Sequence, residues 1–186
     1  MIKIISKSQM IKYLNKSEFV THIGRLYYLW KDKAGKTVIL YLGNSKQDFL
    51  KFIENVKMIY GDPCRISFID KKSRAIENAI IGYLDGKIKK FDFKVEFLTG
   101  TRFQKSIWKK LASVPYGETV SYKKLSFLSG YERAWRAAGS ALNRNPVMLV
   151  IPCHRVIKSN GNIGRFASGT KLKEFLVNLE KGVNNT

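Results

Sequence analysis

The pattern of hydrophobic and polar positions over the first half of the chain predicts a hairpin, two helices and a further strand. The run RLYYLWKDKAGKTVILYL, residues 25–42, contains two β-rich stretches around a Gly-containing turn, which indicates an antiparallel hairpin. After Ser45, a candidate N-cap, apolar residues recur with helical spacing over residues 49–56. A candidate strand over residues 64–69 precedes a second helix over residues 73–84, which an Asp-Gly pair ends.

The middle of the chain begins with an alternating segment and continues with a helix. In KFDFKVEF, residues 90–97, apolar and charged residues alternate, so we expect an extended segment that lies along both halves of the chain. Thr101 and Gln104 then have the spacing of a capping box, in which two side chains satisfy the first free N–H groups of a helix. We therefore expect a helix from this point to about Ser113.

Two short helices follow, and their arrangement is typical of a helix-turn-helix. The first begins near Ser121, and the second covers residues 132–145 after a turn that contains Gly130. At about 100° per residue, the second helix has a basic stripe and an apolar stripe. The basic stripe comprises Arg133, Arg136, Ser140 and Arg144, and the apolar stripe comprises Trp135, Ala138 and Leu142. An ordinary packed surface helix is the alternative interpretation.

The C-terminal part of the chain predicts a buried strand, a loop and a last helix. PVMLVIP, residues 146–152, is a candidate buried strand that delivers Cys153 to its end, and residues 159–169 have the Gly and Asn of a loop. The last helix covers residues 170–180 and turns an apolar face inward. That face comprises Leu172, Phe175, Leu176 and Leu179, and Glu180 follows near enough to it to reach inside.

Charge narrows the choice of partner. The 186 residues include 34 basic and 14 acidic side chains, which gives a formal charge of +20. The excess is spread over the chain, since residues 1–92 carry 18 basic and 9 acidic side chains and the remainder carries 16 and 5. A polyanionic partner explains this charge most simply. The alternative is a lysine-rich surface on a protein from a hot or salty setting.

The few cysteines and the absence of long apolar runs favour a reducing, cytoplasmic location. Two cysteines cannot form a disulfide framework, and no stretch approaches the roughly 18 apolar residues of a membrane span. The N-terminus also lacks the apolar run of a signal peptide. Only Cys64 and His22 could ligate zinc in the first half, which is too few. We expect no metal and no cofactor.

Cys153 and His154 are the candidate reactive residues. A free thiol is mostly protonated at neutral pH, so a nucleophilic cysteine needs a base. His154 is adjacent, but neighbours on a strand point to opposite faces, so a turn or a bridging water would have to join them. Glu180 could orient the imidazole. The alternative is a small, inert, buried cysteine.

Five motifs in one register resemble the O6-alkylguanine-DNA alkyltransferase family, also called methylated-DNA protein-cysteine methyltransferases. They are GTRFQKSIW, PYGETVSY, RAWRAAGSALNRNP, IPCHRV and NGNIGRFASGTKLKEFL, and together they cover about residues 98–182. The resemblance implies an α+β fold. Residues 1–92 would form a small α/β, ribonuclease H-like support domain that contains the antiparallel hairpin. Residues 93–186 would form a mostly helical domain with a winged helix-turn-helix.

The resemblance also implies a function, namely repair of double-stranded DNA that contains alkylated guanine. The alkyl group of O6-alkylguanine, and also of O4-alkylthymine, would pass directly to a cysteine after base flipping from a minor-groove complex. The thioether product has no good leaving group, so transfer would be stoichiometric and irreversible. The protein would act as a monomer, in the cytoplasm or, in a eukaryote, in the nucleus.

Residue roles follow from the same resemblance. Cys153 matches the acceptor thiolate, and His154 with Glu180 matches a water-bridged relay. Tyr122 would donate a proton to the guanine ring, and Asn145 would buttress the turn before the active-site segment. The substrate pocket would include Val156, Phe166 and Ala167, with Phe166 in place of the more usual tyrosine.

The DNA-contacting residues implied by the resemblance lie on the two short helices. Arg136 would enter the stack in place of the flipped nucleotide. The other implied contacts are Ser121, Ala134, Trp135, Ala137, Gly139, Ser140 and Arg144. Because Trp135 stands where smaller apolar residues are commoner, we expect its ring to pack inward.

Two other classes of protein share parts of this pattern. A helix-turn-helix regulator would explain the charge and Arg136, and it would tolerate replacement of Cys153 by serine. A cysteine hydrolase would explain Cys153 and His154, but it would turn over repeatedly and would not need such a charge.

Overall fold

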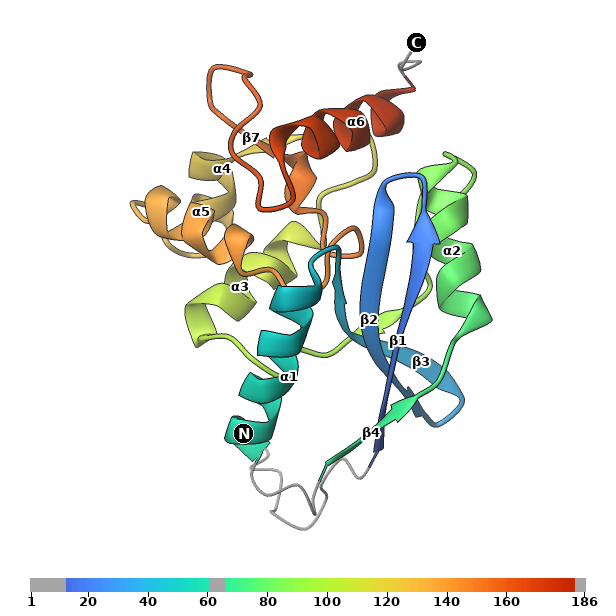
Figure 1. Cartoon of the computed structure of the whole chain (residues 1–186). Coiled ribbons are helices and arrows are strands. Elements are labelled where there is room, and N and C mark those ends of the chain that lie inside the picture. The colour runs from blue at the N-terminus through green and yellow to red at the C-terminus, as the bar shows by residue number, and fades with distance from the viewer. Residues whose placement is uncertain (1–12, 61–65, 183–186) are drawn as a thin grey trace.

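The computed structural model describes residues 13–60 and 66–182, which form an α+β protein built on one mixed sheet (Figure 1). The sheet order is β4-β1-β2-β3-β5. The strands are β1 (Tyr13–Thr21), β2 (Gly24–Lys33), β3 (Lys36–Gly43), β4 (Ser67–Asp70) and β5 (Lys94–Val95). Strands β1, β2 and β3 are antiparallel, whereas β4 and β5 run parallel to β1 and β3 at the two edges.

The predicted hairpin is confirmed as β2 and β3. A two-residue turn joins them, and its residues Ala34 and Gly35 have φ values of 52° and 72°. Positive φ at both central residues is the geometry whose twist matches that of the flanking strands. Strand β1 was not predicted, because Leu14 is the one fully buried residue among its nine, and the apolar alternation is correspondingly weak.

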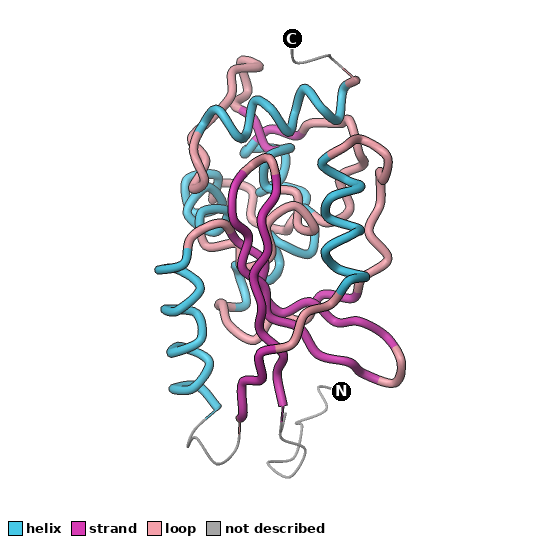
Figure 2. The backbone as a smooth tube through the Cα atoms, turned by 45° about the vertical axis from the view of Figure 1, so that its right-hand side comes forward, coloured by secondary structure: helices cyan, strands magenta, loops and turns pink. Residues whose placement is uncertain are grey.

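Two helices lie on opposite faces of this sheet (Figures 1 and 2). Helix α1 (Lys46–Tyr60) and helix α2 (Arg74–Leu84) are both confirmed, with Ser45 and Ser73 accepting backbone N–H groups at their starts. Alternate residues of β2 point to the two faces. Tyr27 and Leu29 pack with α1, whereas Leu26, Tyr28 and Trp30 pack with α2 and the second half of the chain.

The second half of the chain is mostly helical. Its elements are α3 (Arg102–Leu111), α4 (Tyr122–Leu128), α5 (Trp135–Asn143), α6 (Thr170–Lys181), and the parallel pair β6 (Val120–Ser121) and β7 (Val156–Ile157). The capping box of Thr101 and Gln104 is present as predicted. The indole N–H of Trp108 donates to the carbonyl of Ala141 at 2.8 Å and joins α3 to α5.

One hydrophobic core joins the two halves. Buried residues of β2, β3 and α2 belong to the same cluster as buried residues of α3, α5 and α6. The backbone adds a direct link, because Leu42 N–H donates to Pro146 at 2.9 Å and Met148 N–H donates to Leu42 at 2.8 Å. The site described below is therefore held from both sides.

The prediction of a buried strand over residues 146–152 was wrong. Val147 makes a single bridge to Leu42, and turns follow it. Leu149 has a φ of 68°, and a 3₁₀ helix, η1 (Cys153–Arg155), follows. The segment is apolar because it is buried, and a short apolar run does not distinguish a strand from buried turns.

The alternating segment 90–97 is confirmed as an extended connection. Phe91, Phe93, Val95 and Phe97 are half-buried and pack against the shared core. Within this segment, only the residues of β5 are hydrogen-bonded as a strand. None of the helices in the described ranges is both long and apolar enough to cross a membrane.

Gly100 allows the start of α3 to pack, and replacing it tests that packing. Gly100 has a φ of 96°, and a Cβ there would lie 2.5 Å from the ring of Trp108. We expect Gly100→Ala to lower the free energy of unfolding by about 2–5 kcal/mol, from backbone strain plus overpacking. Urea denaturation measures this loss.

Gly130→Ala is the matched control. Gly130 has a φ of 84°, but no atom lies within 4 Å of an added Cβ. The control should therefore lose only the backbone contribution of about 1–2 kcal/mol. Equal losses in the two variants would contradict the importance of the Trp108 contact.

Candidate active site

Cys153 lies at the start of η1, almost buried at 7% exposure. The side-chain amide of Asn145 donates one N–H to Sγ of Cys153 at 3.2 Å and another to the carbonyl of Ile151 at 2.8 Å. Its oxygen accepts the N–H of Val147 at 3.0 Å. Asn145 therefore closes the turn that precedes Cys153 and places a polar hydrogen against the sulfur.

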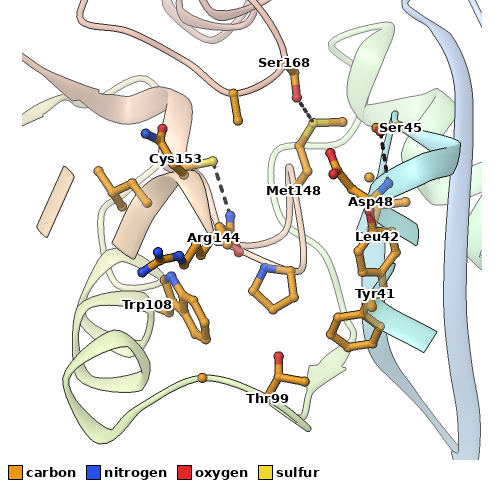
Figure 3. A pocket seen from close by; sticks show the side chains of 18 of the residues that line it. Tyr41, Leu42, Ser45, Asp48, Thr99, Trp108, Arg144, Met148, Cys153 and Ser168 are labelled. Atoms are coloured by element: carbon orange, nitrogen blue, oxygen red, sulfur yellow. Dashed lines mark hydrogen bonds between the residues drawn. The ribbon is translucent and has the colours of Figure 1, made fainter. Parts of the chain in front are cut away.

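Cys153 lines a cavity of about 440 Å³ between the two halves of the chain (Figure 3). The end of β3 and the start of α1 form one wall, with Asp48 among the lining residues. Trp108, Arg144 and the loop of residues 166–168 form the other. Phe166 and Ala167 are thus at the cavity as expected. Val156 is fully buried in β7 and does not line this cavity.

The loop of residues 166–168 is tied to the first half of the chain. The hydroxyl of Ser168 donates to Oδ1 of Asn44 at 2.9 Å and lies 3.3 Å from the sulfur of Met148 (Figure 3). Asn44 follows β3 directly. The position of this cavity wall therefore depends on a residue far away in the sequence.

A buried network surrounds the carboxylate of Glu180, which α6 carries at its end. His154 Nε2 lies 2.9 Å from Oε1 of Glu180. Arg155 donates through Nε to Oε2 at 2.8 Å and through Nη2 to Oε1 at 2.8 Å. The hydroxyl of Tyr83 donates to Oε1 at 2.5 Å, and the N–H of Gly117 donates to Oε2 at 3.1 Å. The sequence prediction that Glu180 reaches inside is confirmed.

The network determines the protonation of His154. Burial raises the pKa of Glu180, but hydrogen bonds from His154 and Arg155 outweigh it and lower that pKa to about 2. Burial lowers the pKa of His154, so its ring is neutral at pH 7. Because Nε2 faces an ionised carboxylate, the single ring proton is on Nε2. Nδ1 is left as a base, and within the described ranges it is buried without a hydrogen-bond partner.

Burial raises the pKa of the Cys153 thiol, while the Asn145 amide and the charge of Lys173 lower it. Lys173 is 1% exposed, and its ammonium group donates to the carbonyl of Val156 at 2.5 Å. It also lies over the rings of Tyr122 and Phe166, at 5.7 and 6.0 Å from their centroids. The sulfur is thus a protonated thiol at rest with a buried cation in its surroundings.

The sequence prediction missed Lys173, because it assigned the inner face of the last helix by apolar residues alone. The fully buried positions of α6 are Lys173, Leu176, Val177 and Glu180. Leu172, Phe175 and Leu179 are only half-buried, so the predicted face was rotated. The spacing of Lys173 and Glu180, two turns apart, was the signal that could have located this stripe.

Tyr122 is the first residue of α4, and its half-buried ring lies at the same site. Its hydroxyl donates to the carbonyl of Arg165 at 3.4 Å. Burial, followed by the nearby Cys153, raises the pKa of this phenol. A Cβ at Gly139 of α5 would lie 3.7 Å from the ring, an ordinary van der Waals contact, so α5 packs directly against Tyr122. Ser121 caps α4 by accepting the N–H of Lys124.

The outer face of α5 carries the predicted basic stripe. Arg133 precedes the helix, Arg136 and Ser140 lie along it, and Arg144 follows its last residue, all exposed. Ala137 is also exposed, and Ala134 is half-buried.

The expectation that Trp135 packs inward was wrong, because its side chain is 41% exposed. Trp135 is the first residue of α5, one turn before the buried Ala138, and its ring lies in a shallow pocket with Phe127 and Lys124. The inward face of α5 consists of Ala138, Ala141 and Leu142.

The structure describes only one of the two residues considered as zinc ligands. Cys64 lies outside the described residues. The ring of His22 packs edge-to-face against Phe175, with centroids 5.6 Å apart. Within residues 13–60 and 66–182, no group of three or more His, Cys, Asp or Glu side chains is arranged to hold a metal ion.

The buried Glu180 network predicts acid-sensitive stability. The folded pKa of Glu180 is about 2 against an ordinary 4.5, and that of His154 is below its ordinary 6.5. Both groups bind protons more readily in the unfolded chain, so stability should fall as the pH drops below 6.5 and further between 4.5 and 2. At neutral pH, Glu180→Gln should lose about 3–5 kcal/mol, because it leaves Arg155 unpaired.

Urea denaturation over this pH range measures both effects. Glu54→Gln is the control, since Glu54 pairs with Lys57 on the surface and should contribute less than about 1 kcal/mol. The steep loss between pH 4.5 and 2 should disappear in Glu180→Gln and persist in Glu54→Gln. If Glu180→Gln were as stable as Glu54→Gln at neutral pH, the network would not have the role assigned to it.

Comparisons with known proteins agree with this arrangement. A family model described as 6-O-methylguanine DNA methyltransferase, DNA binding domain, matches residues 102–182. The methylated-DNA–protein-cysteine methyltransferase of Bacillus subtilis, described as inducible, is 40% identical over 112 residues, 60% of this chain and 62% of that protein. The crystal structure of Mycobacterium tuberculosis OGT in complex with DNA has a TM-score of 0.71 at 27% identity, covering 92% of this chain and 94% of that one.

A relative from Methanosarcina barkeri matches over most of both chains. That protein, a methylated-DNA–protein-cysteine methyltransferase, is 43% identical over 147 residues, which are 77% of this chain and 90% of the relative. Identity at this level over nearly the whole relative shows that the present chain belongs to the methylated-DNA–protein-cysteine methyltransferase family.

Proposed function

We propose that this protein repairs double-stranded DNA by transferring the alkyl group of O6-alkylguanine to Cys153. The observation that carries the proposal is the buried thiol of Cys153, next in sequence to His154, whose Nε2 faces the ionised carboxylate of Glu180. The family supports the reaction class. The names of the relatives from Methanosarcina barkeri and Bacillus subtilis describe transfer from methylated DNA to a protein cysteine.

The chemistry follows from the protonation states. A water bridges Cys153 to Nδ1 of His154, the unpaired base, and relays the thiol proton to it. The sulfur then attacks the alkyl carbon, an S–C bond forms, and the bond between that carbon and O6 breaks. The bonding electrons return to the purine ring, which takes a proton from Tyr122. Because the thioether has no good leaving group, each chain reacts once.

Lys173 and Asn145 favour the charged intermediate. The ammonium group of Lys173 stabilises negative charge on sulfur, which burial otherwise disfavours. The Asn145 amide donates to the sulfur and keeps the preceding turn closed. The backbone around Ala167 lies over the O6 edge of the base, and Phe166 completes the substrate pocket, whereas the buried Val156 supports the site from β7.

The DNA is bound through its minor groove by α4 and α5, acting as a winged helix-turn-helix. At 7% exposure, Cys153 is out of reach of a base that stays in the stack, so the damaged nucleotide rotates into the cavity. Arg136 fills the space that the nucleotide leaves. The remaining contacts with the DNA are Ser121, Ala134, Trp135, Ala137, Gly139, Ser140 and Arg144. The formal charge of +20 supplies attraction to the phosphates.

The finer assignments complete the proposal. Residues 1–92 form a ribonuclease H-like support domain, and residues 93–186 form the DNA-binding and alkyl-accepting domain. The protein acts as a monomer in the cytoplasm, or in the nucleus of a eukaryote. O4-alkylthymine is a second substrate, since its alkyl group occupies an equivalent edge of the base.

A mass measurement tests the reaction directly. Mixed with excess duplex that contains O6-methylguanine, the protein should gain one methyl group per chain, on the peptide that contains Cys153, and then stop. Cys153→Ala should gain none and still bind the duplex, because binding comes from groove and phosphate contacts. Intact-protein mass spectrometry and peptide mapping provide the measurement. Continued turnover, or a methyl group on another residue, would contradict the proposal.

Arg136→Ala tests the assigned role of the exposed arginine on α5. We expect repair of duplex DNA to slow about tenfold, equivalent to about 1.4 kcal/mol. Reaction with free O6-alkylguanine should be unchanged, because no nucleotide has to leave a stack. Arg74→Ala is the control, since Arg74 is an exposed arginine on α2, far from α5 in sequence. Equal slowing with duplex and with free base would remove the role assigned to Arg136.

A further inference from the structure

Tyr83 places one hydroxyl of the first half of the chain directly on the proposed proton relay. It lies on α2 and is fully buried. Its ring packs against Phe91 and Tyr116, with centroids 4.9 and 6.0 Å away. Its oxygen lies 2.5 Å from Oε1 of Glu180 and 3.1 Å from Nε2 of His154. The ring belongs to the core, whereas the hydroxyl contacts the two ionisable groups of the relay.

Two groups lie within hydrogen-bonding distance of this hydroxyl, Glu180 and His154, and its single proton goes to one of them. Burial, and then the charge of Glu180, raise the pKa of Tyr83 far above neutrality, so the phenol keeps its proton. The phenol donates this proton in its hydrogen bond to the closer group, the carboxylate of Glu180. The phenol oxygen can then only accept from His154, so Nε2–H faces two acceptors, Oε1 of Glu180 and the oxygen of Tyr83.

We propose that Tyr83 is a positioning residue that holds the proton of His154 on Nε2 and thereby keeps Nδ1 free to accept the proton of Cys153. This inference rests on the proposed function. It assigns the first half of the chain a part in the reaction, in addition to supporting the second half.

The carboxylate alone would hold the ring less firmly. Oε1 of Glu180 is already shared with Arg155, which donates to it through Nη2 at 2.8 Å. A neutral imidazole can present either N–H to a carboxylate after its ring rotates. The second acceptor at Tyr83 favours the orientation with Nε2–H toward the pair, since only that orientation uses both oxygens.

Tyr83→Phe removes the hydroxyl and keeps the ring. We expect single-turnover methyl transfer from excess duplex to slow about tenfold at neutral pH, with duplex affinity unchanged. Without the phenol proton on Oε1, the carboxylate favours imidazolium more strongly, so the acid limb of the rate profile should move to higher pH. Rates measured from about pH 5 to about pH 9 report both changes.

Tyr116→Phe is the matched control. Its ring belongs to the same cluster, and its hydroxyl donates to the carbonyl of Leu179 at 3.5 Å instead of to Glu180. This variant should keep the rate and the pH profile of the unchanged protein. Thermal melting corrects both variants for any unfolded fraction. A rate per folded molecule and a pH profile for Tyr83→Phe that match those of Tyr116→Phe would overturn the inference.

The tautomer of His154 can be read without any DNA. The chain has 2 histidines, so a His22→Gln variant labelled with ¹⁵N reports His154 alone. We expect shifts of a neutral ring protonated at Nε2, and a mixture of tautomers once Tyr83→Phe is added. Unchanged shifts would overturn the role of Tyr83 even if transfer is observed. Failure of the unchanged protein to take up a methyl group would instead overturn the proposed function together with this inference.

Discussion

The buried carboxylate of Glu180 is the group on which the reactive site depends. A charge at this depth is unfavourable unless it is paired and hydrogen-bonded, and four residues satisfy it, from α2, the segment before β6, and η1. Because Arg155 supplies the compensating charge, His154 can stay neutral while its Nε2–H is held in place. One ion pair thus stabilises the fold and fixes the protonation of the candidate base.

Burial also explains why the cysteine needs its neighbours. A thiol without solvent keeps its proton, and hydrogen bonds from the backbone of Cys153 and His154 offset the effect of burial only in part. The buried lysine of α6 and the amide of Asn145 make the ionised form more accessible, and the imidazole of His154 does so in the proposed relay. They arrive from α6, from the turn after α5 and from η1, so the reactive centre exists only when these elements are packed together.

Local signals in the sequence were sufficient for most of the fold and for the chemically distinctive residues. Caps at Ser45 and Thr101, the Gly-containing hairpin turn and the helical spacing all depend on short stretches, and each predicted its element. The apolar pattern of residues 146–152 predicted the wrong element, because these residues form buried turns and not a strand. Tyr83 and Lys173 were missed for a related reason: one was assigned to an ordinary helix and the other to a polar position, and only tertiary packing brings them to Cys153 and His154.

The cavity wall formed by residues 166–168 is fastened to Asn44, and the backbone of Leu42 is joined to the segment that leads to Cys153. The first half of the chain is therefore unsuited to replacement by an arbitrary carrier. A chimera that grafts the second half onto another scaffold would have to reproduce an amide at position 44 and, at position 42, a strand backbone free to hydrogen-bond the grafted part. Without them the cavity beside Cys153 would be deformed.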